Sequence, residues 1–372
     1  MKKKIGIFFP LSGRTSKLKK SFFLENPKEF WYGVDYLFKK KDRFKITLID
    51  SRSIPKNLFG KLHVYFDRIT NRYSNFKFSD SRVNIVKNQI LKNDLLISFT
   101  DSGSLSIGRL GLKNKKRKTL LIGGFHTLAD SIDDVPNLLK KNYKKKIRES
   151  LKGLDHIFFF GDVDKQRSIE LFNIPKEKTS LFRHSVDSEF WIPLNLKTNN
   201  TILSVGSDPR RDYATLIKSQ HTYDLKILTR LNLGDLSRHS NVEILKGSFH
   251  NKAISNIELR NLYNLAEIIV VPIKDVFQPS GYSVTMQALA CGKVVVLPNF
   301  KGLWDRMSFI HMENCILYKP EDAVDLGKKI NLIMKNKKLR KKIEKNARKL
   351  AVKTFNLSRT NLDLLNLTNI FN

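Results

Sequence analysis

The segment FQPSGYSVTMQALACGKVVVLPN (277–299) contains the residue types best suited to bind an anion. A polar turn leads into a helix expected over about 281–290, which ends at Gly292 before the next strand. Four residues stand at the start of this helix: Ser280, Gly281, Tyr282 and Ser283. Unpaired backbone N–H groups and the helix dipole attract negative charge there, and Gly281 leaves room for a phosphate. The pattern also fits an ordinary strand–turn–helix with a serine cap.

A second polar turn carries two arginines. In ILSVGSDPRRDYATLIKS (202–219), a strand is expected to end at Gly206, and Arg210 and Arg211 precede a helix. Ligands of open α/β sheets bind beyond the carboxyl ends of the strands. A guanidinium group can also hold a phosphate through two parallel hydrogen bonds. The pair therefore suits a phosphate contact, although a solvated pair is equally ordinary in a chain this rich in Lys and Arg.

The N-terminal half offers one comparable residue. The stretch TLLIGGFHTLAD (119–130) places His126 at the carboxyl end of an expected strand. Histidine can bind or transfer protons near neutral pH, which makes His126 a candidate site residue. A lone histidine after a strand is more often a structural residue with satisfied hydrogen bonds.

Alternating strands and helices must position these residues. The chain has 372 residues, of which 41% are hydrophobic, enough for two buried cores. Short apolar runs bounded by Gly, Pro or Asp suit parallel strands covered on both faces. The expected strands form two sets of six: 5–9, 45–50, 94–99, 119–125, 156–161 and 179–183, then 201–206, 224–229, 242–245, 268–272, 294–298 and 315–318.

Helical periodicity fills the spaces between the strands. Leu259, Leu262, Tyr263 and Ala266 follow a 3.6-residue period, as do apolar residues over 339–351. This alternation predicts an α/β protein with doubly wound parallel sheets in two Rossmann-like domains facing a central cleft. The expected domain bounds are 1–190, a linker at 191–200 and a second domain at 201–355.

The motifs VGSDPRRDYATLI, ELRNLYNLAEIIVVP and PSGYSVTMQALACGKVVV, in this order, resemble the donor-binding half of the GT-B glycosyltransferases. The likeness is to glycosyltransferase family 4 (glycosyl transferases group 1), and it is clearest over 155–355. It implies a retaining, metal-independent hexosyl-type transferase that takes a nucleotide-diphosphate sugar as donor. It also implies that the tail 356–372 returns to the N-terminal domain.

The resemblance assigns roles to the candidate residues. Arg211, or its neighbour Arg210, would bind the donor diphosphate, together with Gly206 and the backbone of 280–283. His126 would lie beside the donor sugar as a catalytic residue. The loop PLSGRT (10–15) would bring Gly13 and Arg14 near the acceptor.

The sequence departs from the family at its E-x7-E motif. Gln287 stands where the second glutamate belongs, and Pro279 stands at the first position. Gln287 can still hydrogen-bond ribose hydroxyls, because a carboxamide both donates and accepts. Two interpretations remain: an enzyme with altered donor contacts, or a non-catalytic protein that still binds nucleotide-sugar or carbohydrate.

No metal or other cofactor is predicted. The eight histidines are scattered without the H-x3-H or H-E-x-x-H spacing of metal sites. The D-x-D pattern Asp162-Val163-Asp164 directly follows an expected strand, and we interpret it as a turn that caps a helix.

The charge predicts an anionic partner. Lys+Arg total 68 against 35 Asp+Glu, a formal net charge of +33, which suits a polyanion, an anionic membrane or acidic small molecules. Within the cluster from Lys140 to Arg148, one helical face carries Lys140, Lys141, Lys144 and Lys145, which would suit the inner leaflet of a membrane. Solvated lysines are the ordinary alternative in a chain this rich in Lys. Specific nucleic-acid binding is disfavoured because the basic runs lack interleaved aromatic residues.

We therefore expect a cytoplasmic, or peripherally membrane-bound, enzyme of cell-surface polysaccharide or glycolipid synthesis. Its acceptor would be a carbohydrate or a lipid-linked molecule. Two cysteines in the chain exclude a disulfide scaffold, in keeping with a reducing compartment. A nucleic-acid-binding protein is the less favoured alternative.

Overall fold

The computed structural model describes residues 2–9, 26–50, 62, 65, 78–219, 221–236, 240–246 and 254–370. The chain divides into two compact units. Unit 1 holds the described parts of 1–22, 33–183 and 361–372, and unit 2 those of 23–32 and 184–360. The chain therefore passes between the units four times along its length.

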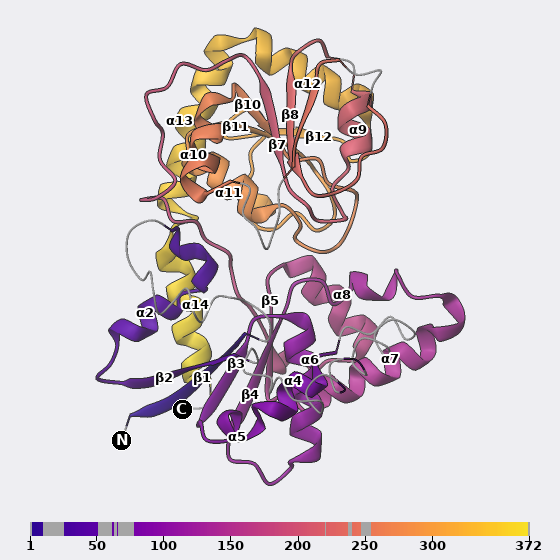
Figure 1. Ribbon diagram of the computed structural model, residues 1–372, viewed down its shortest axis with the longest axis vertical. Helices are drawn as coiled ribbons and strands as arrows, with labels where there is room; N and C mark the ends of the chain where they lie inside the picture. Colours follow the sequence, from indigo (N-terminus) through magenta and orange to yellow (C-terminus); the bar gives the residue numbers. More distant parts are fainter. Residues whose placement is uncertain are drawn as a thin grey trace. The chain divides into compact units, whose positions relative to one another are not determined.

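Unit 1 is built on a six-stranded sheet with the order β2-β1-β3-β4-β5-β6 (Figure 1). Every neighbouring pair is parallel. All four residues of β3 are buried, as expected for a sheet covered on both faces. The strands are β1 Lys3–Phe9, β2 Phe44–Asp50, β3 Leu95–Ser98, β4 Leu120–Phe125, β5 His156–Phe159 and β6 Thr179–Leu181.

Helices follow most strands of unit 1. They are α2 Val34–Lys39, α4 Asp80–Ile85, α5 Lys87–Ile90, α6 Asp101–Lys113, α7 Asn137–Lys152 and α8 Asp162–Phe172, with short 3-10 turns η3 Asp130–Ile132 and η4 Lys176–Lys178. The helix α14 (Leu357–Asn369) starts in unit 2 and belongs to unit 1 from Asn361 onward. Within unit 1, Asp363 of α14 forms an ion pair with Arg183 at 2.6 Å, so the tail is bound to this unit.

Unit 2 repeats the architecture with a six-stranded parallel sheet, ordered β12-β11-β10-β7-β8-β9. Its strands are β7 Ile202–Val205, β8 Leu225–Thr229, β9 Val242–Lys246, β10 Ile268–Val270, β11 Val294–Pro298 and β12 Ile316–Tyr318. Its helices are α9 Tyr213–Lys218, α10 Asn256–Leu265, α11 Tyr282–Ala290, α12 Ala323–Lys335 and α13 Lys337–Lys353, with η1 Lys28–Trp31 and η5 Arg306–Ser308.

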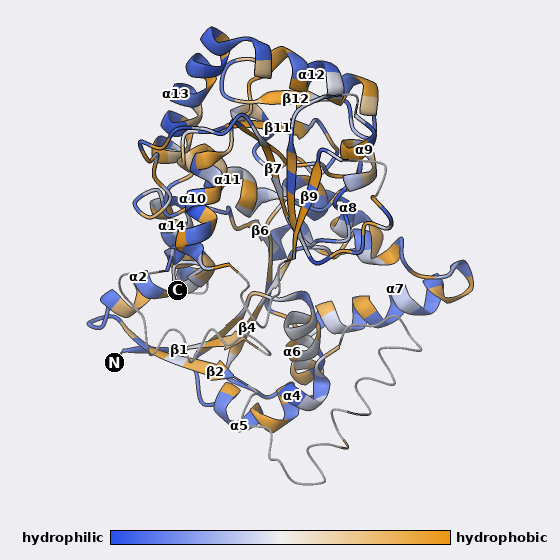
Figure 2. Ribbon diagram, turned by 45° about the horizontal axis from the view of Figure 1, so that its top comes forward, coloured by the Kyte–Doolittle hydropathy of each residue, from blue (hydrophilic) through white to orange (hydrophobic). Residues whose placement is uncertain are grey.

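Both faces of the unit 2 sheet carry a hydrophobic core. Leu203 packs in a cluster that includes Met286 of α11 and Ala347 of α13. Its neighbour Ile202 packs on the other face in a cluster that includes Leu216 of α9. This alternation explains why whole strands are apolar, and the strands are largely orange in Figure 2, where orange marks hydrophobic residues.

All twelve expected strands are present, six in each unit, which confirms the predicted α/β class with two parallel sheets. Strand ends differ by one or two residues. The run expected over 268–272 ends at Val270, close to Pro272, which has no N–H to donate to a neighbouring strand.

The expected linker at 191–200 begins in well-packed structure. The change of unit falls at Arg183–His184, and both Val186 and Trp191 are fully buried in a core cluster of unit 2. A buried tryptophan binds the start of this stretch to unit 2, which the polar composition of the residues after Pro193 did not indicate.

Close packing of α6 on α7 depends on two glycines of unit 1. A Cβ added at Gly108 would lie 2.0 Å from the Ser150 carbonyl oxygen, and one added at Gly153 would lie 1.9 Å from the Gly108 carbonyl oxygen. The two backbones therefore touch without an intervening side chain. This contact supports β4, whose carboxyl end carries His126.

We expect Gly108→Ala to lower the free energy of unfolding by about 1–3 kcal/mol, because the added methyl group must push the helices apart. Urea denaturation followed by circular dichroism measures the change. Lys113→Ala, at an exposed position of the same helix, is the matched control and should change it by about 0.5 kcal/mol or less. Equal stability of Gly108→Ala and the wild type would contradict this account.

Candidate functional site

The arginine turn of unit 2 is held against the loop that follows β10. Arg211 and Ile273 form an isolated antiparallel bridge. The N–H of Lys274 donates to the carbonyl oxygen of Arg210 at 3.0 Å. These backbone pairs fix both arginines beside the carboxyl ends of β7 and β10, where open parallel sheets bind their ligands.

The guanidinium of Arg211 lies between two glycines. A Cβ added at Gly206 would be 2.3 Å from Arg211 Nε, and one added at Gly281 would be 3.2 Å from Arg211 Nη1. Both glycines have positive φ, +150° and +80°, so a side chain at either position would also strain the backbone. The two polar turns identified in the sequence therefore meet at one guanidinium.

Arg211 is buried, and no carboxylate of the described residues forms an ion pair with it. Its side chain and backbone together are 6% exposed, and neither Nε nor Nη1 has a hydrogen-bond partner in the described part of the chain. A buried charge is costly unless it is paired. Two unsatisfied cationic donors at a strand end therefore mark a site suited to an anionic ligand.

Helix α11 adds a second source of positive potential. It starts at Tyr282 with Gly281 as its N-cap, and no side chain caps its first turn. The start of a helix and its dipole favour negative charge, and here no side chain of the cap residue competes for that place. Arg211 and the start of α11 together concentrate positive potential at one place in unit 2.

The side chain of Ser280 is engaged within the turn. Its hydroxyl donates to Asp208 Oδ2 at 2.6 Å, and the N–H of Arg210 donates to Asp208 Oδ1 at 2.9 Å. Asp208 therefore connects the arginine turn to the loop before α11. The N–H of Ser280 also donates, to the carbonyl oxygen of Gln278 at 2.8 Å, so both its hydroxyl and the N–H expected to bind a phosphate are engaged within the loop.

Tyr282 is held by aromatic contacts. Its ring stacks on His184, with ring centroids 3.3 Å apart, and meets the edge of Trp304 at 6.2 Å. Ser283 follows as a partly exposed residue in the first turn of α11. The stack fixes the direction in which α11 leaves the loop.

Gln287 is buried, with 3% exposure. Its Oε1 accepts a hydrogen bond from the Tyr263 hydroxyl at 3.1 Å. Its Nε2 donates to Glu29 Oε1 at 3.0 Å. The carboxamide expected to bind a ribose thus belongs to a network inside unit 2.

In unit 1, His126 stands at the end of β4 as expected. Its Nε2 lies 3.0 Å from the carbonyl oxygen of Phe99, and its ring stacks on Phe160 at 3.8 Å. The carbonyl can only accept, so Nε2 carries the proton and Nδ1 is the acceptor of the neutral ring. The carboxylate of Asp101 accepts hydrogen bonds from the backbone N–H groups of His126 and Thr127 and so holds the turn after β4. Gly13 and Arg14 lie outside the described residues.

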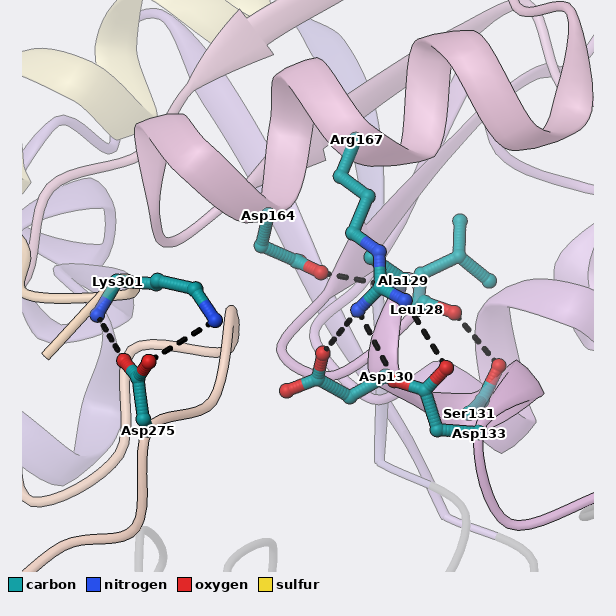
Figure 3. A network of polar contacts seen from close by, with 9 residues as sticks. All are labelled: Leu128, Ala129, Asp130, Ser131, Asp133, Asp164, Arg167, Asp275 and Lys301. Carbon is teal, nitrogen blue, oxygen red and sulfur yellow. Dashed lines mark hydrogen bonds and ion pairs between the residues drawn. The ribbon is translucent and has the colours of Figure 1, made fainter. Parts of the chain in front are cut away.

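The D-x-D residues start α8 without capping it by a side chain. The N-cap is Gly161 with no side-chain bond, so our interpretation of Asp162 and Asp164 as cap residues was wrong. Asp164 instead accepts the N–H of Ala129 at 2.9 Å and is fully buried. Nearby, Arg167 pairs with Asp130 and Asp133 (Figure 3). This network connects α8 to the turn after β4.

Two features of the described residues bear on partners. No group of three or more His, Cys, Asp or Glu side chains gathers there as a metal site would require. No helix among those residues has the length and apolar content needed to span a bilayer.

Three residues near the candidate site were not identified from the sequence: Glu29, Asp208 and His184. Glu29 stands in NPKEFWYG (26–33), where a lone carboxylate lies among aromatic residues. A lone carboxylate among aromatic residues indicates a buried acid, and this pattern could have identified Glu29. The contacts of Asp208 and His184 depend on tertiary structure and had no comparable signal.

Residues 237–350 match the family model described as "Glycosyl transferases group 1". No curated protein sequence matches the chain. The match overlaps the C-terminal part of the region over which the motifs resemble that group.

Solved structures share the whole fold. A Rickettsia africae glycosyltransferase aligns over 99% of this chain and 98% of its own, with 18% identity and a TM-score of 0.61. Anabaena HepE in complex with UDP-glucose aligns over 98% and 99%, with 13% identity and a TM-score of 0.68. Thermosynechococcus elongatus sucrose-phosphate synthase aligns over 99% and 98%, with 14% identity and a TM-score of 0.69. The chain thus has the GT-B fold, and the domain match supports a glycosyltransferase.

The buried Asp164 makes a pH-dependent contribution to stability. Burial raises the pKa of Asp164 well above 3.8, and the nearby Asp101 and Asp130 raise it further. The folded state therefore holds this proton more tightly than the unfolded state, so the contribution is largest at low pH. It declines as pH rises through the folded-state pKa.

We expect Asp164→Asn to be at least as stable as the wild type at pH 7, because the amide oxygen can still accept the Ala129 N–H and cannot ionise. Urea denaturation at pH 4, 5.5 and 7 should show that the difference in free energy of unfolding between the variant and the wild type shrinks towards pH 4. Asp162→Asn, at an exposed carboxylate of the same turn, is the control. If Asp164→Asn had a lower free energy of unfolding than the wild type by the same amount at every pH, this interpretation would be contradicted.

Proposed function

We propose that the protein transfers a hexose from a nucleotide-diphosphate sugar to a carbohydrate or lipid-linked acceptor, with retention of configuration. It would be a family 4 enzyme with an altered E-x7-E motif. One observation carries the proposal: the buried guanidinium of Arg211, with two unpaired donors, lies beside Gly206 and the uncapped start of α11.

This arrangement fits the chemistry of the leaving group. As the glycosidic bond to the diphosphate breaks, negative charge develops on the phosphate oxygens. Preorganised donors that meet this charge lower the barrier, because they need no reorganisation at that moment. Arg211 and the backbone of α11 would supply such donors, with Arg210 close by.

The same positive groups would let the reaction proceed without a divalent cation. We propose no resident metal, since Arg211 and the helix dipole can neutralise the leaving diphosphate. A transfer assay in the presence of a chelator tests this point directly.

His126 would act on the donor sugar or its acceptor. Its Nδ1 is the acceptor nitrogen in the neutral ring, because Nε2 donates to the Phe99 carbonyl. Gly13 and Arg14 would belong to the acceptor side.

We expect Arg211→Met to weaken UDP binding by about 100-fold or more, since it removes a preorganised charge contact. The ligand-free variant should melt at the same temperature as the wild type or higher, because an unpaired buried charge is replaced by an apolar side chain of similar length. Isothermal titration and thermal melting measure the two effects.

Arg210→Met is the matched comparison, since it removes the neighbouring charge from a partly exposed position. It should weaken UDP binding less than Arg211→Met. Wild-type affinity in Arg211→Met would remove Arg211 from the site. Saturable UDP binding without turnover on any nucleotide-sugar would favour the non-catalytic binder.

We also propose that the acceptor is reached at an anionic, cytoplasmic membrane face through α7. Tyr143, Ile147 and Leu151 of this helix are buried, which leaves Lys141, Lys145 and Lys146 exposed. Leu138, at the start of α7, is 93% exposed. Exposed lysines beside an apolar side chain suit the surface of an anionic bilayer.

Replacing Lys141, Lys145 and Lys146 by Gln should weaken binding to vesicles with phosphatidylserine by about 100-fold, at ~1 kcal/mol per lysine. The same change at Lys337, Lys338 and Lys345, exposed on α13, removes equal charge and should have a smaller effect. Vesicle sedimentation measures both. Equal losses from the two triple variants would show a general charge effect and contradict docking through α7.

A further inference from the structure

The segment 26–32 forms part of unit 2, although the chain from Gly33 to Arg183 belongs to unit 1. The N–H of Lys28 donates to Asp187 Oδ2 at 3.0 Å, and Asn256 Nδ2 donates to Asn26 Oδ1 at 2.8 Å. The segment thereby brings Glu29 against residues that follow it by more than 150 positions.

The carboxylate of Glu29 is buried and satisfied on both oxygens. Oε1 accepts from Trp191 Nε1 at 2.7 Å and from Gln287 Nε2 at 3.0 Å. Oε2 accepts from the backbone N–H of Asp187 at 3.2 Å. Three donors converge on one acid that is 8% exposed, which is more than packing alone requires.

These bonds orient Gln287. The indole of Trp191 can only donate, so Glu29 presents acceptor oxygens to its neighbours. The amide nitrogen of Gln287 therefore faces Glu29, and its carbonyl faces the Tyr263 hydroxyl. Gln287 is fixed from both sides, by segment 26–32 and by α10.

Gln287 and the start of the anion site lie on the same short helix. Helix α11 has nine residues and opens at Gly281 beside Arg211, so it is about 13 Å long. A helix this short moves as one body. Rotation or sliding at Gln287 would therefore displace the first turn, which begins at Gly281 beside Arg211.

Glu29 and Gln287 also match in charge. A glutamate at position 287 would bring two carboxylates within about 3 Å of each other in a buried place, where they cannot both ionise without a large cost. A carboxamide instead donates to the acid. The glutamine at 287 is thus the residue type that a buried acid at 29 requires.

We propose that Glu29 is a positioning residue for the nucleotide-diphosphate site, which holds α11 through Gln287 and supplies from segment 26–32 the carboxylate absent from the helix. The inference rests on the proposed function. Glu29 acts through Gln287 and does not itself contact the donor.

Titration of Glu29 gives a readout that simple packing would not. Burial raises the pKa of Glu29 to about 7, and the charge of Asp187 adds to the effect, whereas the bonds from Gln287 and Trp191 oppose it. Near pH 5.5 Glu29 is protonated and can donate to a carboxylate at position 287. Towards pH 8 the pair loses that shared proton only against the repulsion of its two charges, which pushes the side chain at position 287 away from Glu29.

The test measures binding to the full-length protein by isothermal titration with UDP, GDP, ADP, CDP and dTDP, and continues with the tightest ligand. Gln287→Glu should weaken that binding by at least tenfold at pH 8 and by less than threefold at pH 5.5. Adding Glu29→Gln to this variant should recover most of the loss at pH 8, because it removes one of the two charges.

Glu189→Gln is the matched control, since it removes an exposed carboxylate two residues from Asp187. It should bind as the wild type does. Thermal melting of every variant confirms that it is folded, and donor KM should rise in Gln287→Glu with a smaller change in kcat.

The outcomes separate the two proposals. If the wild type binds none of the nucleoside diphosphates, the proposed function fails, and this inference fails with it. If the wild type binds but Gln287→Glu binds equally well at pH 8, or its defect is the same at both pH values, Glu29 has no positioning role. Failure of Glu29→Gln to restore binding would also overturn it.

Discussion

The candidate site of unit 2 depends on a positive charge for which the described residues supply no ion-pair partner. Removing a guanidinium from water is costly, and most buried arginines recover that cost through a carboxylate or several carbonyl groups. Arg340 of α13 does so, with Glu267 at 2.5 Å and the carbonyl oxygens of Ile333 and Met334. Arg211 does not, since two of its nitrogens lack any partner in the described chain. The difference between these two arginines separates a structural cation from one kept for a ligand.

Keeping that charge in place imposes conditions on its surroundings. Gly206 and Gly281 must lack side chains, because a Cβ at either would collide with the guanidinium or crowd it. Backbone hydrogen bonds must hold the turn that carries Arg211, and the bridge between Arg211 and Ile273 does so. Two hydrophobic layers then fix the sheet itself, so that strand ends and helix starts keep their spacing.

Much of this organisation could be predicted from sequence, because its signals are local. Apolar runs such as 294–298 match strands residue for residue, and the turns containing Gly206, Arg211 and Gly281 follow strands as expected. The contacts of the glycines with Arg211 could be anticipated only because parallel strands bring their carboxyl ends to one edge. Tertiary contacts could not be predicted in this way. Asp208 accepts a hydrogen bond from the Ser280 hydroxyl, and Trp191 packs the start of the expected linker into a hydrophobic core. Glu29 lies 258 positions from Gln287, a separation over which periodicity carries no information.

The four passages of the chain between units set an order for folding during synthesis. Segment 26–32 leaves the ribosome long before Trp191 and Gln287 exist to receive it. At about 5–20 residues per second, it waits on the order of 10–50 s for α11. Unit 2 cannot close around Glu29 until nearly the whole polypeptide has been made. On a nascent chain, water therefore solvates this acid and its aromatic neighbours for most of translation, and the buried contacts of Glu29 form among the last in unit 2.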